Sequence, residues 1–416
     1  MNIEIINTGS ELLLGRVLNT HQQWLCRRLA DAGYETERQV AVADTGEAIQ
    51  QAVREAMGRA RLIIVTGGLG PTSDDITRDK IAELLGCALH EDESVVAHVR
   101  GFFTRRNRPM PDRVRIQAMV PDGALVIAND HGTAPGLVMS FGEGGCLVML
   151  PGPPRELRPM FADKILPLIR ERFPLGGGFA CVTLKSTGVG ESLMEEMLEA
   201  PLRELVARGL VVGFCARTGE VDIRLSARGE GAAALVAEGS AIARDVGGRH
   251  IFGSEDEQLE EVVVRLLIGR GETLALAESC TGGYVGHCIT NVSGASAVLM
   301  SGCITYSNAA KTRLLGVREA TLAEHGAVSR ETVLEMAQGA RESAGTDYAL
   351  AVTGIAGPTG GTPEKPVGTV YIGLASAAGL KAIHSINAFD RETFKFVTAR
   401  QALELLRRTL TRADVE

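Results

Sequence analysis

The chain has 416 residues, of which 45% are hydrophobic and 23% are charged, and its formal net charge is −8. This length exceeds one ordinary domain, so we expect two or three globular domains with large cores. The acidic balance argues against a dedicated binder of nucleic acids or anionic membranes, and no apolar run reaches the roughly 18 residues of a spanning helix. Eight scattered cysteines without a CxxC pair indicate a reduced, cytoplasmic protein without a zinc site.

The first region, about residues 1–170, alternates strand-like and helical patterns, which is typical of an α/β domain. Its first residues enter a strand at once and do not resemble a signal peptide. Aromatic residues make up only 4% of the chain, so its cores consist of Val, Ile, Leu and Ala, which suits parallel strands covered on both faces. The apolar period predicts a helix over about 21–32. The predicted strands are IEIINTG, RLIIVTGG and CLVMLPGPP.

Four polar, glycine-rich segments interrupt this region, at 7–15, 66–79, 129–136 and 151–156. Three of them directly follow apolar strands, and the carboxyl ends of parallel strands meet at one edge of a sheet, where ligands bind. Glycine lets the backbone approach a phosphate closely, and helix N-termini favour its charge. The pattern therefore favours a nucleotide or another phosphate-containing ligand.

The acidic residues in these segments allow two interpretations. Asp74 and Asp75 could hold Mg²⁺ or a similar hard cation that bridges to phosphate oxygens, and Glu11 could add a carboxylate or orient a water molecule. Alternatively, the glycines only form tight turns, and the two aspartates cap a helix that begins near Ile76.

The middle region, about 171–252, is predicted to be a small α+β unit. It follows a linker, LGGGF, and contains the strands ACVTLKSTG, VVGFCARTG and EVDIRLSAR. Helices are expected over about 191–207 and 231–246. In the last strand, Val221, Ile223 and Leu225 alternate with charged residues, so we expect this strand to be half-exposed.

The third region, about 253–416, contains a predicted strand, TLALA, followed by ESCTGG. Ser279 therefore lies at a strand-to-helix turn. It is either a helix cap or a nucleophile, with the N–H groups of Thr281 to Gly283 as candidates for an oxyanion hole. Cys280 is the rival nucleophile, but a thiol needs a lowered pKa to act, and no histidine is adjacent.

A base for Ser279 is offered by CITYSNAAKTRLLGV, residues 303–317. Ser307 or Asn308 is expected to cap a helix whose first turn contains Lys311. A cation there opposes the helix dipole, which together with burial would lower the lysine pKa. A neutral lysine can take a serine proton, and Tyr306 could relay or donate one. The alternative is that Lys311 is a solvated surface residue and Tyr306 belongs to the core.

A third strand of this region, YALAVTG, ends in the Gly/Pro-rich segment IAGPTGGTPEKPVG. Loops of this kind line anion or ligand pockets. Three strand ends would again converge on one sheet edge.

The segments GGLGPTSDDITRD, NTGSELLLG, GTAPG and LPGPPRE closely resemble the N-terminal domain of the CinA (competence/damage-inducible) family. The resemblance implies a three-layer, molybdopterin-binding-like fold and an ADP-ribose pyrophosphatase that needs a divalent metal (Mg, Co or Mn) and is aided by potassium. The resemblance assigns the binding of this divalent metal to Asp74 and Asp75. This chain departs from the family before GTAPG, where Asn129 matches better than Asp130 or His131. The substrate-binding residues implied are Glu11, Gly67, Gly68, Gly70, Thr77, Asn129, Gly132, Thr133, Gly152 and Pro153.

ESCTGG, TYSNAAK and TGIAGPTGG resemble the C-terminal CinA domain, which is similar to nicotinamide-nucleotide amidases. This resemblance implies hydrolysis of nicotinamide mononucleotide (NMN) to nicotinate mononucleotide and ammonia, without a cofactor, by Ser279, Tyr306 and Lys311. The substrate-binding residues implied are Cys280, Thr281, Gly282, Gly283, Asn308, Thr353 and Gly354, with Arg391 or Arg400 for the phosphate. Together the two resemblances cover nearly the whole chain, and they favour a homodimer.

Two alternatives to a two-activity salvage enzyme stay open. The N-terminal domain could bind a nucleotide without hydrolysing it, or the chain could be a non-enzymatic ligand-sensing protein in DNA uptake or damage response. The presence of both Ser279 and Lys311 favours chemistry. The expected partners are small nucleotides, with neither nucleic acid nor membrane.

Overall fold

The computed structural model describes residues 1–412. It divides into two compact units, which are treated separately below. Unit 1 comprises Met1–Cys181 and Arg228–Gly231, and unit 2 comprises Val182–Ala227 and the chain from Ala232 onward. Within the described chain, no helix combines the length and the apolar character needed to cross a membrane.

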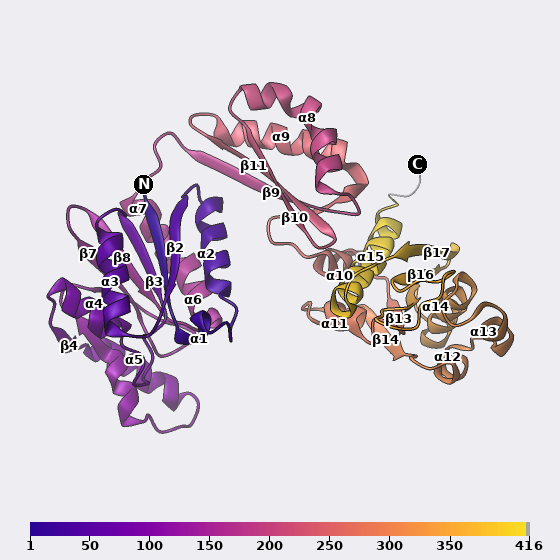
Figure 1. Ribbon diagram of the computed structural model, residues 1–416, viewed down its shortest axis with the longest axis horizontal. Coiled ribbons are helices and arrows are strands. Elements are labelled where there is room, and N and C mark those ends of the chain that lie inside the picture. The colour runs from indigo at the N-terminus through magenta and orange to yellow at the C-terminus, as the bar shows by residue number, and fades with distance from the viewer. Residues whose placement is uncertain (413–416) are drawn as a thin grey trace. The chain divides into compact units, whose positions relative to one another are not determined.

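Unit 1 is built on a six-stranded sheet with the order β2-β1-β3-β8-β7-β6 (Figure 1). β2, β1, β3 and β8 are parallel; β7 pairs antiparallel with β8, and β6 pairs antiparallel with β7. β4 and β5 form a separate two-stranded antiparallel sheet. The strands are β1 Ile3–Thr8, β2 Thr36–Val42, β3 Leu62–Thr66, β4 Leu89–Glu91, β5 Met119–Pro121, β6 Leu125–Ile127, β7 Gly136–Phe141 and β8 Gly145–Leu150.

Helices cover both faces of this sheet, because its central strands are apolar on both sides. In β3, Leu62 and Ile64 pack with α2, α6 and α7, whereas Ile63 and Val65 pack with α3, α4 and α5. The helix predicted over 21–32 is confirmed as α2. The helices are α1 Ser10–Leu13, α2 Thr20–Asp31, α3 Gly46–Met57, α4 Thr77–Leu85, α5 Glu93–Thr104, α6 Pro154–Met160 and α7 Leu166–Arg172.

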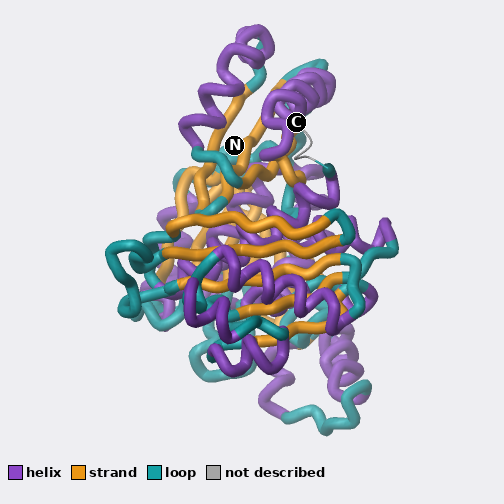
Figure 2. Tube along the Cα trace, turned by 90° about the vertical axis from the view of Figure 1, so that its right-hand side faces the viewer, coloured by secondary structure: helices purple, strands orange, loops and turns teal. Residues whose placement is uncertain are grey.

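Unit 2 contains two sheets with their flanking helices; Figure 2 draws strands in orange and helices in purple. The smaller sheet has the order β10-β11-β9-β12, and α8 and α9 pack against each other beside it. The predicted helices at 191–207 and 231–246 are confirmed. These elements are β9 Phe179–Thr187, α8 Glu191–Ala207, β10 Val211–Arg217, β11 Glu220–Arg228, α9 Ala232–Gly247 and β12 Ile251–Ser254.

The prediction that β11 is half-exposed is wrong. Glu220 and Asp222 are buried along with the apolar residues of the strand. The Asp222 carboxylate lies 2.5 Å from Lys185 Nζ and 2.6 Å from the Arg217 guanidinium. The charged face is therefore buried through its own ion pairs, which a pattern of alternating charges does not reveal.

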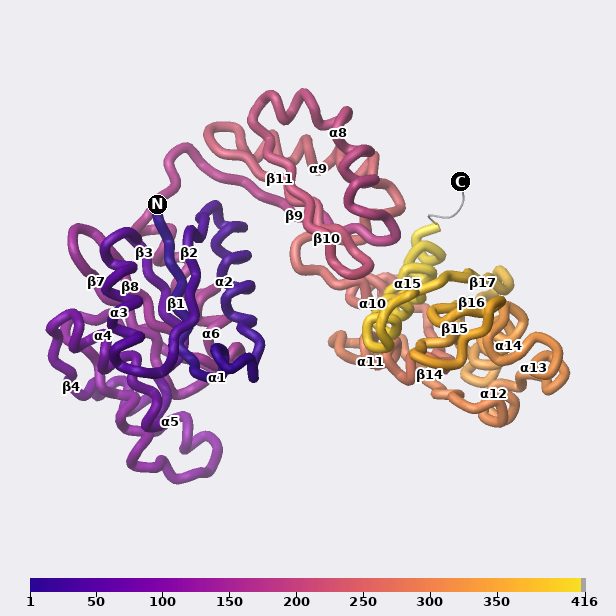
Figure 3. Tube along the Cα trace, in the orientation of Figure 1, coloured from indigo at the N-terminus to yellow at the C-terminus, as the bar shows by residue number. Residues whose placement is uncertain are grey.

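The larger sheet has the order β14-β13-β15-β16-β17, and Figure 3 follows the chain through it. β14, β13 and β15 are parallel, and β16 and β17 are antiparallel. The elements are α10 Leu259–Arg270, β13 Leu274–Glu278, α11 Tyr284–Thr290, β14 Leu299–Ile304, α12 Asn308–Leu315, α13 Glu319–His325, α14 Arg330–Ala344, β15 Tyr348–Gly354, β16 Thr369–Ser376, β17 Gly379–Ile386 and α15 Arg391–Thr411.

The two faces of this sheet differ in side-chain size. Leu274 and Leu276 of β13 pack with α10, α11 and α15, whereas Ala275 and Ala277 face α14. The period of two along a strand produces this division. α14 therefore lies against a surface of small side chains.

Candidate functional site

Unit 1 has a cavity of about 480 Å³ at the carboxyl ends of β1, β3 and β8, which we call the glycine-turn cavity. Residues from all four glycine-rich segments line it. The predicted site residues in its lining are Glu11, Gly67, Gly68, Gly70, Asp74, Asp75, Thr133, Gly152 and Pro153.

The turn after β3 needs glycine at several positions. Gly67 and Gly68 have φ angles of 96° and 67°, in the left-handed region that glycine tolerates without strain. A Cβ on Gly68 would overlap the Thr77 hydroxyl, and a Cβ on Gly70 would overlap the Asp75 carboxylate. The backbone therefore approaches these polar groups more closely than any other residue type would allow.

Five carboxylates line the glycine-turn cavity, and two of them, Asp44 and Glu156, were missed by the sequence analysis. Asp44 follows β2 as directly as Glu11 follows β1, so the same strand-end argument would have found it. The Asp74 pKa lies below its usual range, because the Thr72 side chain donates a hydrogen bond to its carboxylate.

The carboxylates suit a cation that is only partly held by protein. Among residues 1–412, no three His, Cys, Asp or Glu side chains come together as a ready metal cage. Mg²⁺ is commonly held by one or two carboxylates together with water and substrate phosphates. The donor set fits that mode of binding, with Asp74 and Asp75 as the nearest pair in sequence.

Three predicted site residues lie behind the cavity wall. Thr77 is fully buried, and its hydroxyl is 3.2 Å from that of Thr8. The buried Asn129 amide donates to Ala134 O (2.7 Å) and to Glu156 Oε2 (2.8 Å). A Cβ on Gly132 would overlap the Glu156 carboxylate. These residues hold the loops and Glu156 in position.

The second candidate site lies at the end of β13 in unit 2. Lys311 Nζ is 3.0 Å from Ser279 Oγ and donates to Thr305 O at 2.8 Å. Only 1% of Lys311 is exposed, so the alternative of a solvated surface lysine is wrong. Burial lowers the Lys311 pKa from its ordinary value, which favours the neutral amine that a general base requires.

Local sequence explains how Lys311 reaches the serine. Ser307 caps α12, with its hydroxyl accepting from the N–H of Ala310 at 3.1 Å. Lys311 follows in the first turns of the helix, directed toward the strand ends. On the other side, the Ser279 N–H donates to Val352 O at 3.0 Å, which ties the serine to β15.

Glu278, which directly precedes the serine, was not singled out from the sequence. Its buried carboxylate accepts hydrogen bonds from the N–H groups of Gly283 (3.0 Å), Val285 (3.1 Å) and Gly286 (2.8 Å). It therefore caps α11 in place of an N-cap side chain, and Ser279 is not the cap. Sequence reasoning looked for a cap at the turn itself rather than on the preceding strand.

This capping corrects the predicted oxyanion hole. The Gly283 N–H is taken by Glu278, and the Gly282 N–H donates to Ser279 O at 3.1 Å. Two of the three predicted amides therefore already have partners, and Thr281 is the remaining residue of that set. Its buried side-chain hydroxyl has no hydrogen-bond partner within the described chain.

Cys280 has the properties of a structural cysteine. Its side chain is buried, and burial raises the pKa of the thiol to about 12. Because the thiolate is the nucleophilic form, this residue is a poor nucleophile at neutral pH. A Cβ on Gly354 would lie 3.1 Å from the Cys280 sulfur, so the two residues pack directly together.

Tyr306 is 62% exposed, so the alternative of a core tyrosine is wrong. Its hydroxyl accepts a hydrogen bond from Arg391 Nη2 at 2.7 Å, and Arg391 Nη1 donates to Gly357 O at 3.0 Å. Arg391 thereby connects Tyr306 to the loop after β15. Thr353 is buried, and its hydroxyl donates to Ala327 O at 2.7 Å, whereas Asn308 is exposed at the start of α12.

Arg400 lies elsewhere. Its buried guanidinium pairs with Glu220 and Glu260 and lines a different cavity, which Ser279 does not line. Of the two arginines proposed for the phosphate, only Arg391 contacts other residues of the predicted amidase site.

Three family models match successive parts of the chain and define its class. A probable molybdopterin binding domain covers residues 4–171, a KH domain covers 182–253, and a CinA C-terminal domain covers 256–410. The protein is thus an α/β protein with a molybdopterin-binding-like N-terminal domain, a KH middle domain and a CinA C-terminal domain. Sequence reasoning found the small α+β unit but not its KH character.

Relatives extend the match over the full chain. A CinA-like protein of Akkermansia muciniphila is 43% identical over 97% of this chain and 96% of its own length. A CinA-like protein of Kosmotoga olearia is 41% identical over 99% of both chains. A crystal structure of a competence/damage inducible protein from Agrobacterium tumefaciens is 40% identical, covers 37% of this chain and 97% of its own, and has a TM-score of 0.35. The chain belongs to the CinA family.

Proposed function

We propose that the C-terminal domain hydrolyses the carboxamide of NMN, giving nicotinate mononucleotide and ammonia. The observation that carries this proposal is the 3.0 Å approach of Lys311 Nζ to Ser279 Oγ in a buried setting. A serine paired with a buried lysine of lowered pKa is an arrangement for acyl transfer. The family resemblance supplies the substrate.

The reaction then proceeds through an acyl-enzyme. Ser279 Oγ bonds to the carboxamide carbon and gives its proton to the neutral amine of Lys311. The C–N bond breaks as Lys311 returns that proton to the leaving nitrogen, and ammonia departs. Water attacks the resulting ester and gives a proton to Lys311, and Ser279 Oγ leaves and regains it. The products are the free enzyme and the nicotinate carboxylate.

Arg391 and Tyr306 take the nucleotide end of the substrate in this scheme. The Arg391 guanidinium stands between the Tyr306 hydroxyl and the carbonyl of Gly357. A planar guanidinium suits a phosphate, because it offers paired N–H donors. Tyr306 would keep the guanidinium oriented rather than take the proton from the serine.

The test is ammonia release from NMN by the full chain. Ser279→Ala should abolish it, and Cys280→Ser should retain most of it. Loss of activity in Cys280→Ser with normal activity in Ser279→Ala would transfer the nucleophile to the thiol and refute the proposal.

We further propose that the N-terminal domain hydrolyses ADP-ribose in the presence of a divalent cation. The supporting observation is that five carboxylates and the glycine turn line one cavity. A cation held through Asp74 and Asp75 would neutralise the pyrophosphate charge when bound. Glu11 orients the attacking water, and the amides after β3 receive phosphate oxygens.

The rival is a domain that binds ADP-ribose without hydrolysing it. Incubation with ADP-ribose and Mg²⁺, Mn²⁺ or Co²⁺, with and without potassium, separates the two. Release of AMP and ribose 5-phosphate that stops on chelation supports hydrolysis. Saturable binding without products supports the rival.

The KH domain does not change the expectation that nucleotides rather than nucleic acids are the partners. KH domains hold nucleic acid through a GxxG loop. Residues 182–253 contain no glycine pair with that spacing. Saturable binding of single-stranded RNA or DNA at physiological salt would contradict the expectation.

A further inference from the structure

The lining of the glycine-turn cavity in unit 1 is acidic. It contains five carboxylates and, among the described residues, no Lys, Arg or His. The diphosphate of ADP-ribose is itself an anion, so such a ligand meets a lining of its own sign. A divalent cation held by Asp74 and Asp75 is balanced by those two carboxylates alone. We therefore expect a further positive group at the edge of the cavity.

A short helix packs against the turn after β3 that forms one wall of this cavity. It is the 3₁₀ helix η1, Asp112–Ala118. Its Gln117 amide donates to Leu69 O at 3.4 Å, and its Arg113 Nε donates to Pro71 O at 3.2 Å. Leu69 and Pro71 both line the cavity. Arg113 is thus anchored at the cavity edge, although its side chain is exposed.

The two terminal amino groups of Arg113 are free. Nε makes the bond to Pro71 O, and within residues 1–412 neither Nη1 nor Nη2 has a hydrogen-bond or ion-pair partner. The charge nevertheless reaches the cavity, because the Asp74 pKa is lowered mainly by the Thr72 hydrogen bond and to a smaller extent by Arg113. Paired N–H donors on a planar group match the oxygens of a phosphate.

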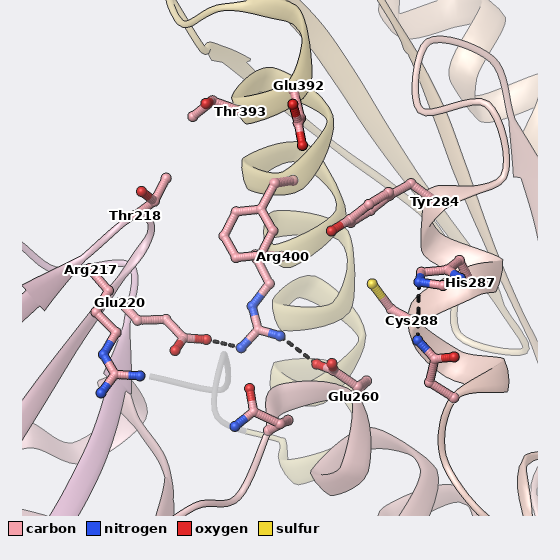
Figure 4. A pocket seen from close by; sticks show the side chains of 13 residues that line it. Arg217, Thr218, Glu220, Glu260, Tyr284, His287, Cys288, Glu392, Thr393 and Arg400 are labelled. Atoms are coloured by element: carbon pink, nitrogen blue, oxygen red, sulfur yellow. Dashed lines mark hydrogen bonds and ion pairs between the residues drawn. The ribbon is translucent and has the colours of Figure 1, made fainter. Parts of the chain in front are cut away.

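The cavity that Arg400 lines in unit 2 shows the opposite situation. Figure 4 shows the Arg400 guanidinium between Glu220 and Glu260. Arg217 in the same lining lies 2.6 Å from Asp222. An anion could reach either guanidinium only by displacing a carboxylate, whereas the terminal groups of an arginine without such a pair are open to it.

Arg113 belongs to an arginine-rich segment. Residues 100–115 contain six arginines and a single acidic residue, Asp112, in a chain whose formal net charge is −8. Arg115 of this segment is already paired with Glu91, with 2.5 Å between Nε and the carboxylate. A local excess of positive charge attracts anions over a longer range than one contact does. The segment therefore favours the approach of a nucleotide to an otherwise acidic cavity.

We propose that Arg113 binds a phosphate of the nucleotide in the glycine-turn cavity, which rests on the nucleotide site proposed above. Nη1 and Nη2 donate to two phosphate oxygens, while Nε stays on Pro71 O. A divalent cation bound at Asp74 and Asp75 occupies these carboxylates, so the guanidinium is left for the phosphate. Arg113 is then the positive group that the lining lacks.

The probes are ADP and adenosine, each titrated calorimetrically into the full chain in the presence of Mg²⁺. Arg113→Gln should weaken ADP binding about tenfold at low salt and less at high salt, because the guanidinium is exposed and screened. Adenosine has no phosphate, so its binding should not change. Arg113→Lys keeps the charge but loses the paired donors, and its ADP affinity should lie between the two.

Arg54→Gln is the matched control. Arg54 is an exposed arginine in the last turn of α3, which leads into the start of β3 and therefore lies at the sheet edge opposite the cavity. ADP binding should be normal in this variant. An equal loss in Arg54→Gln, or wild-type ADP affinity in Arg113→Gln, would overturn the assignment. So would a loss in Arg155→Gln alone, since Arg155 lies 3.8 Å from the Glu156 carboxylate.

Hydrolysis of ADP-ribose by the wild type is measured in parallel, which separates the two proposals. Weakened ADP binding in Arg113→Gln without hydrolysis by the wild type would refute the pyrophosphatase and support the phosphate contact. Hydrolysis by the wild type together with unchanged ADP binding in Arg113→Gln would refute the contact alone. No binding of ADP by the wild type at millimolar concentrations would overturn the contact as well.

Discussion

Replacement of Glu278 tests whether one buried carboxylate holds the catalytic turn in place. Glu278→Ala removes the acceptor for three backbone N–H groups at 3.0, 3.1 and 2.8 Å. A hydrogen bond to a charged group contributes about 1.5–3 kcal/mol, and such terms are not additive. We therefore expect a loss of about 3 kcal/mol in the free energy of unfolding, which exceeds the loss of an ordinary helix cap, about 1 kcal/mol.

This loss in the free energy of unfolding should appear as a lower melting temperature, Tm. For a unit of roughly 200 residues, 1 kcal/mol shifts Tm by about 2–4 °C, so Glu278→Ala should lower the transition of unit 2 by about 6–12 °C. Glu278→Gln keeps one acceptor oxygen and should lie between the variant and the wild type. Glu319→Gln is the matched control, because Glu319 is an exposed residue in the first turn of α13.

The same variant should lose turnover at a temperature where it is folded. A displacement of the nucleophile by about 1 Å can reduce the rate about 100-fold. Ammonia release should therefore fall in kcat with little change in KM, because the variant leaves Arg391, the residue proposed to bind the nucleotide, untouched. A variant with wild-type Tm, or one that is destabilised while its kcat at low temperature is unchanged, would refute the assignment of Glu278 as a positioning residue.

The other predictions concern the separate chemistries. Ser279→Ala should abolish ammonia release while ADP-ribose hydrolysis persists, and parallel loss of both would show that the activities share a site. Asp75→Asn and Asp74→Asn should each cost most of any pyrophosphatase activity, and chelation should mimic them without slowing deamidation. Lys311→Arg should be nearly inactive, because arginine stays protonated; an arginine variant near wild-type rate would make Lys311 an anchor. Because burial lowers the Lys311 pKa, deamidation should rise with pH through one ionisation below the lysine reference of 10.5. The lowered pKa also makes stability depend on pH. As pH rises toward 10.5, the free energy of unfolding of the wild type should increase relative to Lys311→Met, because Lys311 binds a proton more readily in the unfolded chain than in the folded one. A difference in unfolding free energy that does not change with pH would contradict the lowered pKa.

The serine–lysine pair could be anticipated from sequence because its signals are local. Ser279 comes after the segment TLALA and Glu278, at the end of a strand, and Lys311 stands where a cation opposes the helix dipole. The structure brings these two side chains together across 32 positions in the chain. Burial, not the helix end, is the main cause of the lowered Lys311 pKa.

The role of Arg400 could not be anticipated in the same way. Its partners, Glu220 and Glu260, lie on other elements far away in the chain, and a helical arginine carries no mark of which carboxylates it meets. The burial of Asp222 escaped prediction for the same reason, because ion pairing across strands depends on their order and register. Glu278 was overlooked because a cap donated from a preceding strand has no fixed spacing from the helix.

The two faces of the larger sheet should differ in how well they tolerate substitution, because the face against α14 consists largely of alanine and glycine. Ala275 and Ala277 lie against α14, and a Cβ on Gly373 would come within 2.7 Å of Val333 O on that helix. Any enlargement there would push α14 outward, because a packed interior has no free volume to absorb a methyl group. A saturation library of this face should therefore be depleted of every larger side chain, whereas the opposite face should accept exchanges among leucine, isoleucine and methionine. Substitutions in this domain should therefore accumulate on the face of the sheet that packs with α10, α11 and α15, and not on the face that packs with α14.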